Sequence, residues 1–242
     1  MMFYDLNIRG KDLQSDLKII NEANRLGYNH VNLVYDLNNF KDFDYKKDLI
    51  SEVENISQFN KEKLSIDFAV EINPKNPNDI RKGTSKFKKK VKFISVFGGD
   101  VKINRMSCES RQVDILTRPY FKRYDCGMNH VLAKEAVENN VAIELCFTDI
   151  LKSYSNYRSK ILSNFRDLIK LYIKFKFPLI ISSRAESIFD IRSPKDVISI
   201  FKSLGLNNEE LDDIFHNYPK NIIDFGYDKK NIIVLGVKEI EK

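Results

Sequence analysis

The segment from Gln112 to Phe147 constrains the fold most, because it reads as a strand, a basic loop, a helix and a second strand. Val113 to Leu116 is an apolar, β-favouring run that stops before Pro119, since proline fixes φ and lacks a backbone donor. Residues 129–140 switch to helical spacing, and Val141 to Leu145 is again a strand-like run. A helix between two buried strands is a βαβ unit, which predicts a parallel sheet.

The same alternation of strand and helix recurs along the chain and favours an α/β barrel. The absence of GxGxxG and GxxxxGK[ST] argues against a nucleotide-binding doubly wound sheet. We predict one TIM-barrel-like domain over residues 1–242 with about seven strand–helix units, distorted because no eighth unit is evident. The expected strands are Phe3–Asn7, Asn29–Tyr35, Leu64–Ile72, Lys92–Phe97, Val113–Leu116, Val141–Leu145 and Pro178–Ser182, followed by an extended run at Asn231–Val237.

Helices are expected between these strands from their apolar spacing and capping residues. Two of the intervals are special: Asn78–Lys90 is highly charged with a central glycine and predicts a poor helix, and Asn207–Asn217 is expected to be the last helix. The other expected helices are Leu13–Gly27, Leu49–Ile56, Val101–Glu109, Asn129–Asn139, Ile161–Phe175 and Ser193–Gly205.

Composition indicates a cytoplasmic protein. No apolar run approaches the roughly 20 residues that span a bilayer, and the first ten residues lack the pattern of a secretory signal, so we expect no membrane partner. The three cysteines, Cys108, Cys126 and Cys146, form no CxxC pair. They are therefore expected to be reduced thiols.

Positive charge is concentrated in one part of the chain. Between Arg81 and Tyr124 there are 13 Lys/Arg against 3 Asp/Glu, which leaves 27 of the 40 cations and 31 of the 34 acids for the rest. Such asymmetry indicates a polyanionic partner, most often nucleic acid, although a solvated lysine-rich surface is the alternative.

Six cations lie after the fourth, fifth and seventh expected strands, or in the helices that follow. Parallel strands place such positions at one end of a barrel, so we predict a phosphate-binding face there. The run from Lys86 to Lys92 precedes its strand and is expected at the other end. The residues predicted to bind the phosphates of a nucleic acid are Arg105, Arg118, Lys134, Arg184, Arg192 and Lys195.

Carboxylates also occur within the expected strands, at Asp5, Asp67, Glu71, Asp114 and Glu144. A buried carboxylate needs a cation or a metal as its partner. We expect Asp114 and Glu144 to face the interior and to be paired with each other or with a basic side chain.

Neither a metal site nor a catalytic site is indicated. The only histidines, His30, His130 and His216, form no HxH or HExxH motif, and no nucleophile–base pair is visible. The pair Gly98-Gly99 before a helix fits either a phosphate-binding turn or an ordinary tight turn.

An ordered series of short signatures carries a family resemblance over nearly the whole chain. The signatures are Val96-Phe97-Gly98-Gly99-Asp100, Asn104-Arg105, Val113-Asp114-Ile115-Leu116, Arg118-Pro119, Asn129-His130-Val131-Leu132-Ala133-Lys134, Val141-Ala142-Ile143-Glu144, Arg192-Ser193-Pro194 and Leu204-Gly205. The chain resembles the archaeal ribonuclease P protein component 3 family, the counterpart of a subunit of eukaryotic ribonuclease P and MRP.

The resemblance implies a barrel related to the polymerase-and-histidinol-phosphatase phosphoesterases. Those enzymes carry HxH at the end of the first strand, where this chain has Asp5-Leu6-Asn7, so the metal site is expected to be lost. Arg184 is a second departure, because relatives often have a small residue there.

The implied role is that of a non-catalytic subunit that binds the ribonuclease P RNA and supports removal of the 5′ leader from precursor tRNA. Implied partners are ribonuclease P protein component 2, in a two-plus-two assembly, and the other ribonuclease P proteins. No cofactor is expected on the protein itself, and Mg²⁺ is expected with the RNA. The chain alone is expected to be inactive.

Two alternatives belong to other classes. One is a stand-alone metal-dependent phosphoesterase on the same barrel, which the metal content of the purified chain would reveal. The other is a purely structural protein, which would show no salt-dependent affinity for RNA.

Overall fold

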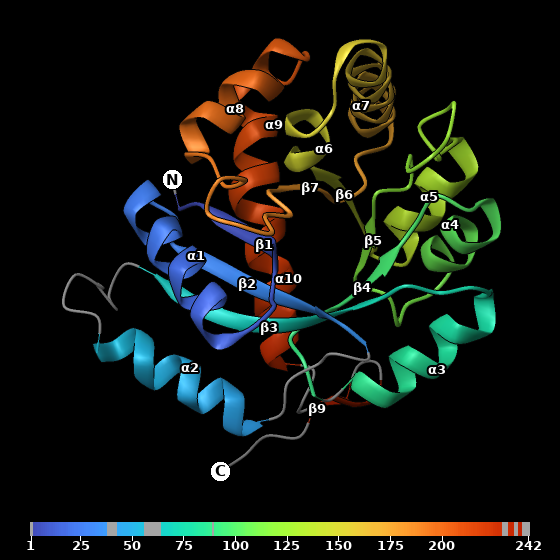
Figure 1. Ribbon diagram of the computed structural model, residues 1–242. Coiled ribbons are helices and arrows are strands. Elements are labelled where there is room, and N and C mark those ends of the chain that lie inside the picture. Colours follow the sequence, from blue (N-terminus) through green and yellow to red (C-terminus); the bar gives the residue numbers. More distant parts are fainter. Residues whose placement is uncertain are drawn as a thin grey trace.

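The computed structural model describes residues 2–37, 43–55, 64–88, 90–228, 232–234 and 237–238, and in this part of the chain seven parallel strands form a nearly closed barrel (Figure 1). Each strand pairs with the next one in sequence. The Arg9 N–H donates to the Ala185 carbonyl at 2.8 Å, so the end of the first strand meets the chain that follows the last one. The strands are β1 (Tyr4–Arg9), β2 (His30–Asp36), β3 (Ser65–Ile72), β4 (Ile94–Phe97), β5 (Ile115–Thr117), β6 (Ala142–Cys146) and β7 (Leu179–Ser182).

Helices surround this ring of strands, as the βαβ pattern requires (Figure 1). No helix among the described residues has the length and hydropathy to cross a membrane. The helices are α1 (Leu13–Leu26), α2 (Phe43–Asn55), α3 (Pro77–Phe87), α4 (Val101–Cys108), α5 (His130–Glu138), α6 (Phe147–Leu151), α7 (Ser155–Phe175), α8 (Pro194–Ser203), α9 (Asn208–Asp212) and α10 (Tyr218–Asp228).

All seven expected strands are confirmed, and the caps explain several helix boundaries. Asp12 caps the start of α1, and Gly27 ends it with a φ of 91°. The α2 prediction is confirmed as far as Asn55, because Ile56 lies outside the described residues. The extended run at 231–237 is described only in part, as the short strands β8 (Ile232–Val234) and β9 (Val237–Lys238).

The expectation of a poor helix at 78–90 is wrong, because α3 is regular and well capped. Asn76 and Asp79 form a capping box at its start. The central Gly83 is required by packing: a Cβ there would lie 2.5 Å from Cδ1 of Ile72 at the end of β3. The glycine that weakens the helix pattern in the sequence therefore brings α3 close to the barrel.

The expectation that the last helix ends at Asn217 is also wrong. A π-helical turn, Asp213–Asn217, joins α9 to α10, and Pro219 lies in the first turn of α10. Proline offers no N–H to the preceding turn, and a wider turn is one way for a helix to accommodate that loss.

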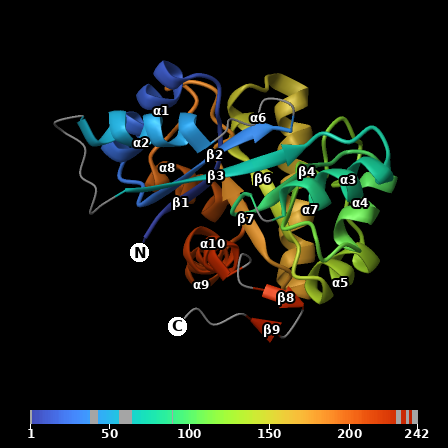
Figure 2. The same ribbon diagram turned by 90° about the horizontal axis from the view of Figure 1, so that it is seen from below.

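Helix α10 lies beside β1 and β7 and covers the amino end of the barrel (Figure 2). Its Ile223 packs with interior residues of the strands, among them Tyr4 and Phe93. The Tyr227 hydroxyl donates to Asp67 at the start of β3, at 2.9 Å. This end of the barrel is therefore filled, and open loops remain at the carboxyl ends of the strands.

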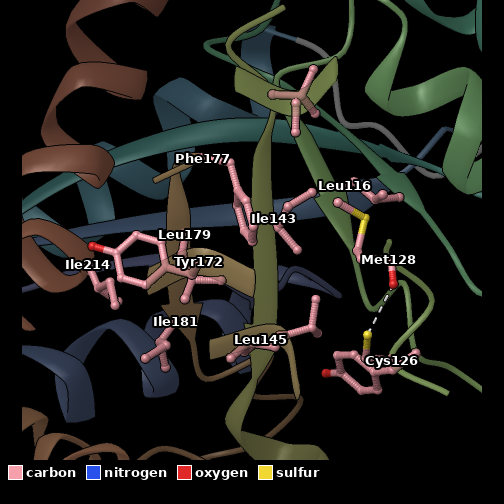
Figure 3. Close-up of a cluster of buried hydrophobic side chains, with 14 of the residues drawn as sticks. Leu116, Cys126, Met128, Ile143, Leu145, Tyr172, Phe177, Leu179, Ile181 and Ile214 are labelled. Carbon is pink, nitrogen blue, oxygen red and sulfur yellow. Dashed lines mark hydrogen bonds between the residues drawn. The ribbon is translucent and has the colours of Figure 1, made fainter. Parts of the chain in front are cut away.

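The main core lies between the strands and the outer helices. Figure 3 shows Ile143 and Leu145 of β6 beside Leu179 and Ile181 of β7, with Tyr172 of α7 nearby. Cys126 Sγ contacts the Met128 carbonyl oxygen at 3.3 Å in the same cluster. All three cysteines are free and buried, as expected for reduced thiols.

Candidate functional site

Buried ion pairs cross the interior at the carboxyl end of the barrel. Arg184, which follows β7, donates to both carboxylate oxygens of Glu71 on β3, at 2.6 and 3.1 Å. Arg9 of β1 lies 3.1 Å from the same carboxylate and 2.5 Å from Asp36 of β2. The Glu71 side chain is 2% exposed. Two guanidinium groups thus neutralise the acids of two neighbouring strands, the buried Glu71 of β3 and the half-exposed Asp36 of β2.

The charge of Arg184 is maintained despite its burial. Burial by itself lowers the pKa of the guanidinium, but the charge and hydrogen bonds of Glu71 outweigh it and leave the pKa above its ordinary value. The Arg184 guanidinium therefore keeps its positive charge inside the barrel.

Glu144 of β6 anchors a second interior group, made of uncharged donors. Its carboxylate accepts hydrogen bonds from Asn7 Nδ2 at 3.0 Å, from Ser182 Oγ at 2.6 Å and from the Thr117 hydroxyl. The expectation that Glu144 faces the interior is confirmed, but these hydrogen-bond donors are neutral side chains.

The same expectation for Asp114 is wrong. Ile115, its neighbour, packs inside the barrel with Ala142 and Ile180. Alternation along the strand therefore turns Asp114 to the other face, where its carboxylate accepts the Ile94 N–H at 2.7 Å.

Asp5 occupies an irregular part of β1, where the pairing with β2 shifts register. Burial raises the pKa of its carboxyl to about 6, although hydrogen bonds from Ser183 and from the Asn7 N–H act in the opposite direction. Asp5 and Asn7 stand where related phosphoesterases were expected to carry HxH. Asn7 uses its amide to hold Glu144, and Asp5 accepts two backbone N–H groups, so both residues have structural roles.

These residues do not fit a divalent metal ion. Two arginines already contact Glu71, and the described part of the chain contains no group of three or more His, Cys, Asp or Glu side chains placed to hold a metal. The ring nitrogens of His30 are taken by Ser65 Oγ and Asn32 Nδ2, at 2.6 and 3.1 Å.

A third ion pair fixes the loop between β5 and α5. Arg118 donates to Asp149 of α6 at 2.9 and 2.5 Å, and the Tyr120 hydroxyl donates to the same carboxylate at 2.8 Å. The guanidinium also lies 4.2 Å from the ring centre of Phe121. Arg118 has a φ of 52°, a left-handed conformation that these contacts stabilise.

The six predicted RNA-binding residues do not form one group of free cations. Arg118 and Arg184 are held in buried ion pairs, and Arg192 donates to the carbonyls of Phe189 and Ile191 at 2.7 Å. Arg105 is 70% exposed and forms a surface pair with Glu109. Lys134 and Lys195 are exposed.

The turn at Gly98-Gly99 is a structural turn with its N–H groups in use. Gly98 donates to the Thr117 carbonyl, and Gly99 donates to Asn104 Oδ1 at 2.9 Å. Asp100 caps α4 by accepting from Lys102 and Ile103. Of the two readings of this pair, the tight turn is correct.

Sequence reasoning missed Arg9 and Asp149, which complete the ion pairs. Asp149 lies four residues after the expected strand Val141–Leu145, at the same end of the barrel as Arg118, and was detectable as an acid near it. Arg9 gave no such signal, because its partners lie on β2 and β3, far along the chain.

The fold and this interior define a class of protein, namely seven-stranded α/β barrels with ion pairs inside. A histidinol phosphate phosphatase from Lactococcus lactis shares the fold with a TM-score of 0.55 and 11% identity, covering 85% of this chain and 94% of the phosphatase. The sequence model described as RNase P subunit p30 matches residues 2–231. The chain belongs to this family.

Relatives of known name agree with this assignment. The ribonuclease P protein component 3 of Methanothermobacter thermautotrophicus is 40% identical, with 98% of this chain and 95% of the relative covered. That of Methanococcoides burtonii is 36% identical, with 71% of each covered. A chain in the cryo-EM structure of archaeal ribonuclease P with mature tRNA matches with a TM-score of 0.78 and 30% identity, covering 99% of this chain and 98% of that one.

Proposed function

We propose that the chain is a protein subunit of ribonuclease P that binds the catalytic RNA and supports removal of the 5′ leader from precursor tRNA. The observation that carries the proposal is the match over nearly full length to a chain of archaeal ribonuclease P. The concentration of positive charge between Arg81 and Tyr124 supports RNA as the direct partner.

The chain contributes no catalytic group of its own in this proposal. The polar interior, where a barrel phosphatase would hold its metal, is occupied by the pairs of Arg9 and Arg184 with carboxylates. Chemistry then belongs to the RNA and its Mg²⁺ ions, and the protein acts by neutralising phosphates. The stand-alone phosphoesterase has no observation in its favour.

Assembly with ribonuclease P protein component 2 in a two-plus-two complex, together with the other ribonuclease P proteins in the cytoplasm, is part of the same proposal. It is supported by the family membership. Light scattering of the mixed proteins would give the mass of a two-plus-two complex, and a one-plus-one mass would refute that stoichiometry.

Reconstitution tests the main proposal. Ribonuclease P RNA and the other protein subunits are assayed for cleavage of precursor tRNA at low Mg²⁺, with and without this chain. Addition of the chain is expected to raise the cleavage rate, and the chain alone is expected to cleave nothing. An unchanged rate would refute the proposal, and cleavage by the chain alone with stoichiometric bound metal would establish the phosphoesterase instead.

A further inference from the structure

Three tyrosines at the carboxyl end of the barrel expose their rings. Tyr124, in the loop between β5 and α5, is 93% exposed. Tyr154 and Tyr157, at the start of α7 after β6, are 76% and 54% exposed. Aromatic rings contribute most to the free energy of folding or binding when they are covered. Three exposed rings at one end of the molecule therefore indicate a surface that binds a ligand.

Cations lie beside these rings. Lys160 Nζ is 5.8 Å from the ring centre of Tyr124, and this contact connects α7 to the β5–α5 loop. The guanidinium carbon of Arg158 is 5.8 Å from the ring centre of Tyr154. Lys160 follows Tyr157 by three residues, so the two share a face of the helix. Residues 150–166 contain four Lys or Arg and no Asp or Glu. Rings and positive charges therefore alternate over this surface.

The loop that carries Tyr124 is fixed by hydrogen bonds. Asn104 Nδ2 donates to the carbonyls of Pro119 and Gly127, both at 2.9 Å. Arg123 donates to the Gly99 carbonyl at 3.1 Å and to Asp125. A fixed loop loses little conformational entropy when its exposed side chains bind a partner.

We propose that this surface binds unpaired nucleotides of an RNA, with bases stacked on the tyrosine rings and phosphates held by the cations. We call it the tyrosine surface, defined by Tyr124, Tyr154 and Tyr157 with Arg158, Lys160 and Lys122, which is exposed in the same loop two residues before Tyr124. The inference rests on the proposed function, because it assumes that the chain binds RNA.

The alternation of rings and cations selects single-stranded RNA among possible ligands. Unpaired bases offer faces for stacking, whereas the bases of a duplex are already stacked on each other. A protein partner is less compatible, because the centre of a protein interface is depleted of charge, and here a cation lies beside two of the three rings.

Binding of the full-length chain to labelled RNA tests the inference. The probes are a short single-stranded oligoribonucleotide, the same strand with abasic positions, and a duplex of equal length. The variant Y124L/Y154L/Y157L removes the rings, and Y124F/Y154F/Y157F keeps them. Phe225→Leu, at a 45% exposed ring of α10 at the opposite end, is the control. Circular dichroism checks that each variant is folded.

Stacking predicts a loss of about fivefold in single-strand affinity for each ring removed, at the lower end of what one stacked base contributes. The Phe variant and the control are expected to bind the single strand with the affinity of the wild type. The abasic strand offers no bases to stack. The wild type is therefore expected to bind it as weakly as the Leu variant binds the normal strand. The salt dependence is expected to be unchanged in the Leu variant and reduced in K122Q/R158Q/K160Q.

The failures of the inference and of the proposed function are distinct. Salt-dependent binding that is equal in the wild type and the Leu variant overturns the inference and leaves the proposed function intact. A Leu variant that keeps its RNA affinity but no longer assembles with the other ribonuclease P proteins overturns it in favour of a protein contact. Absence of any RNA binding by the wild type refutes both.

Discussion

Arg184 and Glu71 face each other across the carboxyl end of the barrel, joined by two hydrogen bonds of 2.6 and 3.1 Å. Arg184 follows the last strand of the sheet, and Glu71 is the last residue but one of the third strand, so this pair connects opposite sides of the barrel. Arg184 is therefore a structural residue, although its position after a strand and its charge predicted an RNA contact.

Removing Arg184 is expected to destabilise the protein. In Arg184→Met, Glu71 stays buried with Arg9 as its remaining cation, and breaking a buried pair from one side costs about 3 kcal/mol. Urea denaturation measures the loss. Glu71→Gln in the same chain is expected to restore part of the stability, because it removes the buried carboxylate that has lost one of its two cations, while Arg9 keeps Asp36 as a partner.

Arg105→Met is the matched control, since its pair with Glu109 is on the surface and 70% of the arginine side chain is exposed. Its effect on stability is expected to be small beside that of Arg184→Met, because solvent screens an exposed pair. Equal effects of the two substitutions would show that the Arg184–Glu71 pair does not support the fold.

Asp5 is expected to make stability depend on pH. Its pKa of about 6 in the folded chain exceeds the value near 3.9 of an unfolded aspartate. The contribution of protonated Asp5 to the free energy of unfolding is therefore fully present below about pH 4 and is lost as the pH rises through about 6. Asp5→Asn keeps an acceptor for the N–H groups of Asn7 and Ser183 but removes the charge.

Urea denaturation of Asp5→Asn and the wild type at several pH values measures this effect. The variant is expected to gain about 2 to 3 kcal/mol relative to the wild type between pH 4 and pH 7, from the difference of about two pKa units. A difference between the two proteins that does not change with pH would contradict the assignment.

The sequence predicted the strands well because each is a short apolar run bounded by polar or turn residues. Sequence reasoning failed where packing against distant residues determines the local structure. The pattern around Gly83 could not show that Ile72 needs the missing Cβ, and Pro219 could not show that a π-helical turn precedes it. For the candidate site, charge and position along the chain could not separate Arg118 and Arg184, which are paired inside, from exposed cations.

The exposed members of the predicted cation set are expected to act on RNA without affecting the fold. Arg105→Ala, Lys134→Ala and Lys195→Ala should each lower the salt slope of RNA affinity by about one unit if the side chain contacts a phosphate. Reconstituted ribonuclease P carrying all three changes should lose activity at low Mg²⁺. Undiminished activity would place the RNA on another face.

Arg118→Ala is expected to lower stability, because the Arg118 side chain is held in a buried pair. The substitution leaves the Asp149 carboxylate, 8% exposed, without its guanidinium, at a cost of about 3 kcal/mol. Thermal denaturation compares it with Lys134→Ala as an exposed control. Equal melting temperatures would show that the Arg118–Asp149 pair contributes nothing to the fold.

Gly127 is expected to be indispensable to the loop that carries Lys122 and Tyr124. Its φ of 73° disfavours any side chain, and a Cβ would lie 1.9 Å from the Pro119 carbonyl oxygen and 2.9 Å from Asn104 Nδ2. Gly27→Ala is the matched control, because Gly27 has a φ of 91° but nothing within 4 Å of its Cβ position. The control is expected to cost about 1 kcal/mol for the left-handed backbone alone.

Gly127→Ala is expected to cost about 3 kcal/mol or more, since the loop backbone must also move away from Pro119 and lose the hydrogen bonds of Asn104. Urea denaturation measures the loss of stability in both alanine variants. The same variant should expose the chain near Lys122 and Arg123 to trypsin and weaken RNA binding, because Tyr124 would no longer be held beside Lys160. If both alanine variants lose the same stability and resist trypsin equally, the close approach of Gly127 to Pro119 does not determine the loop.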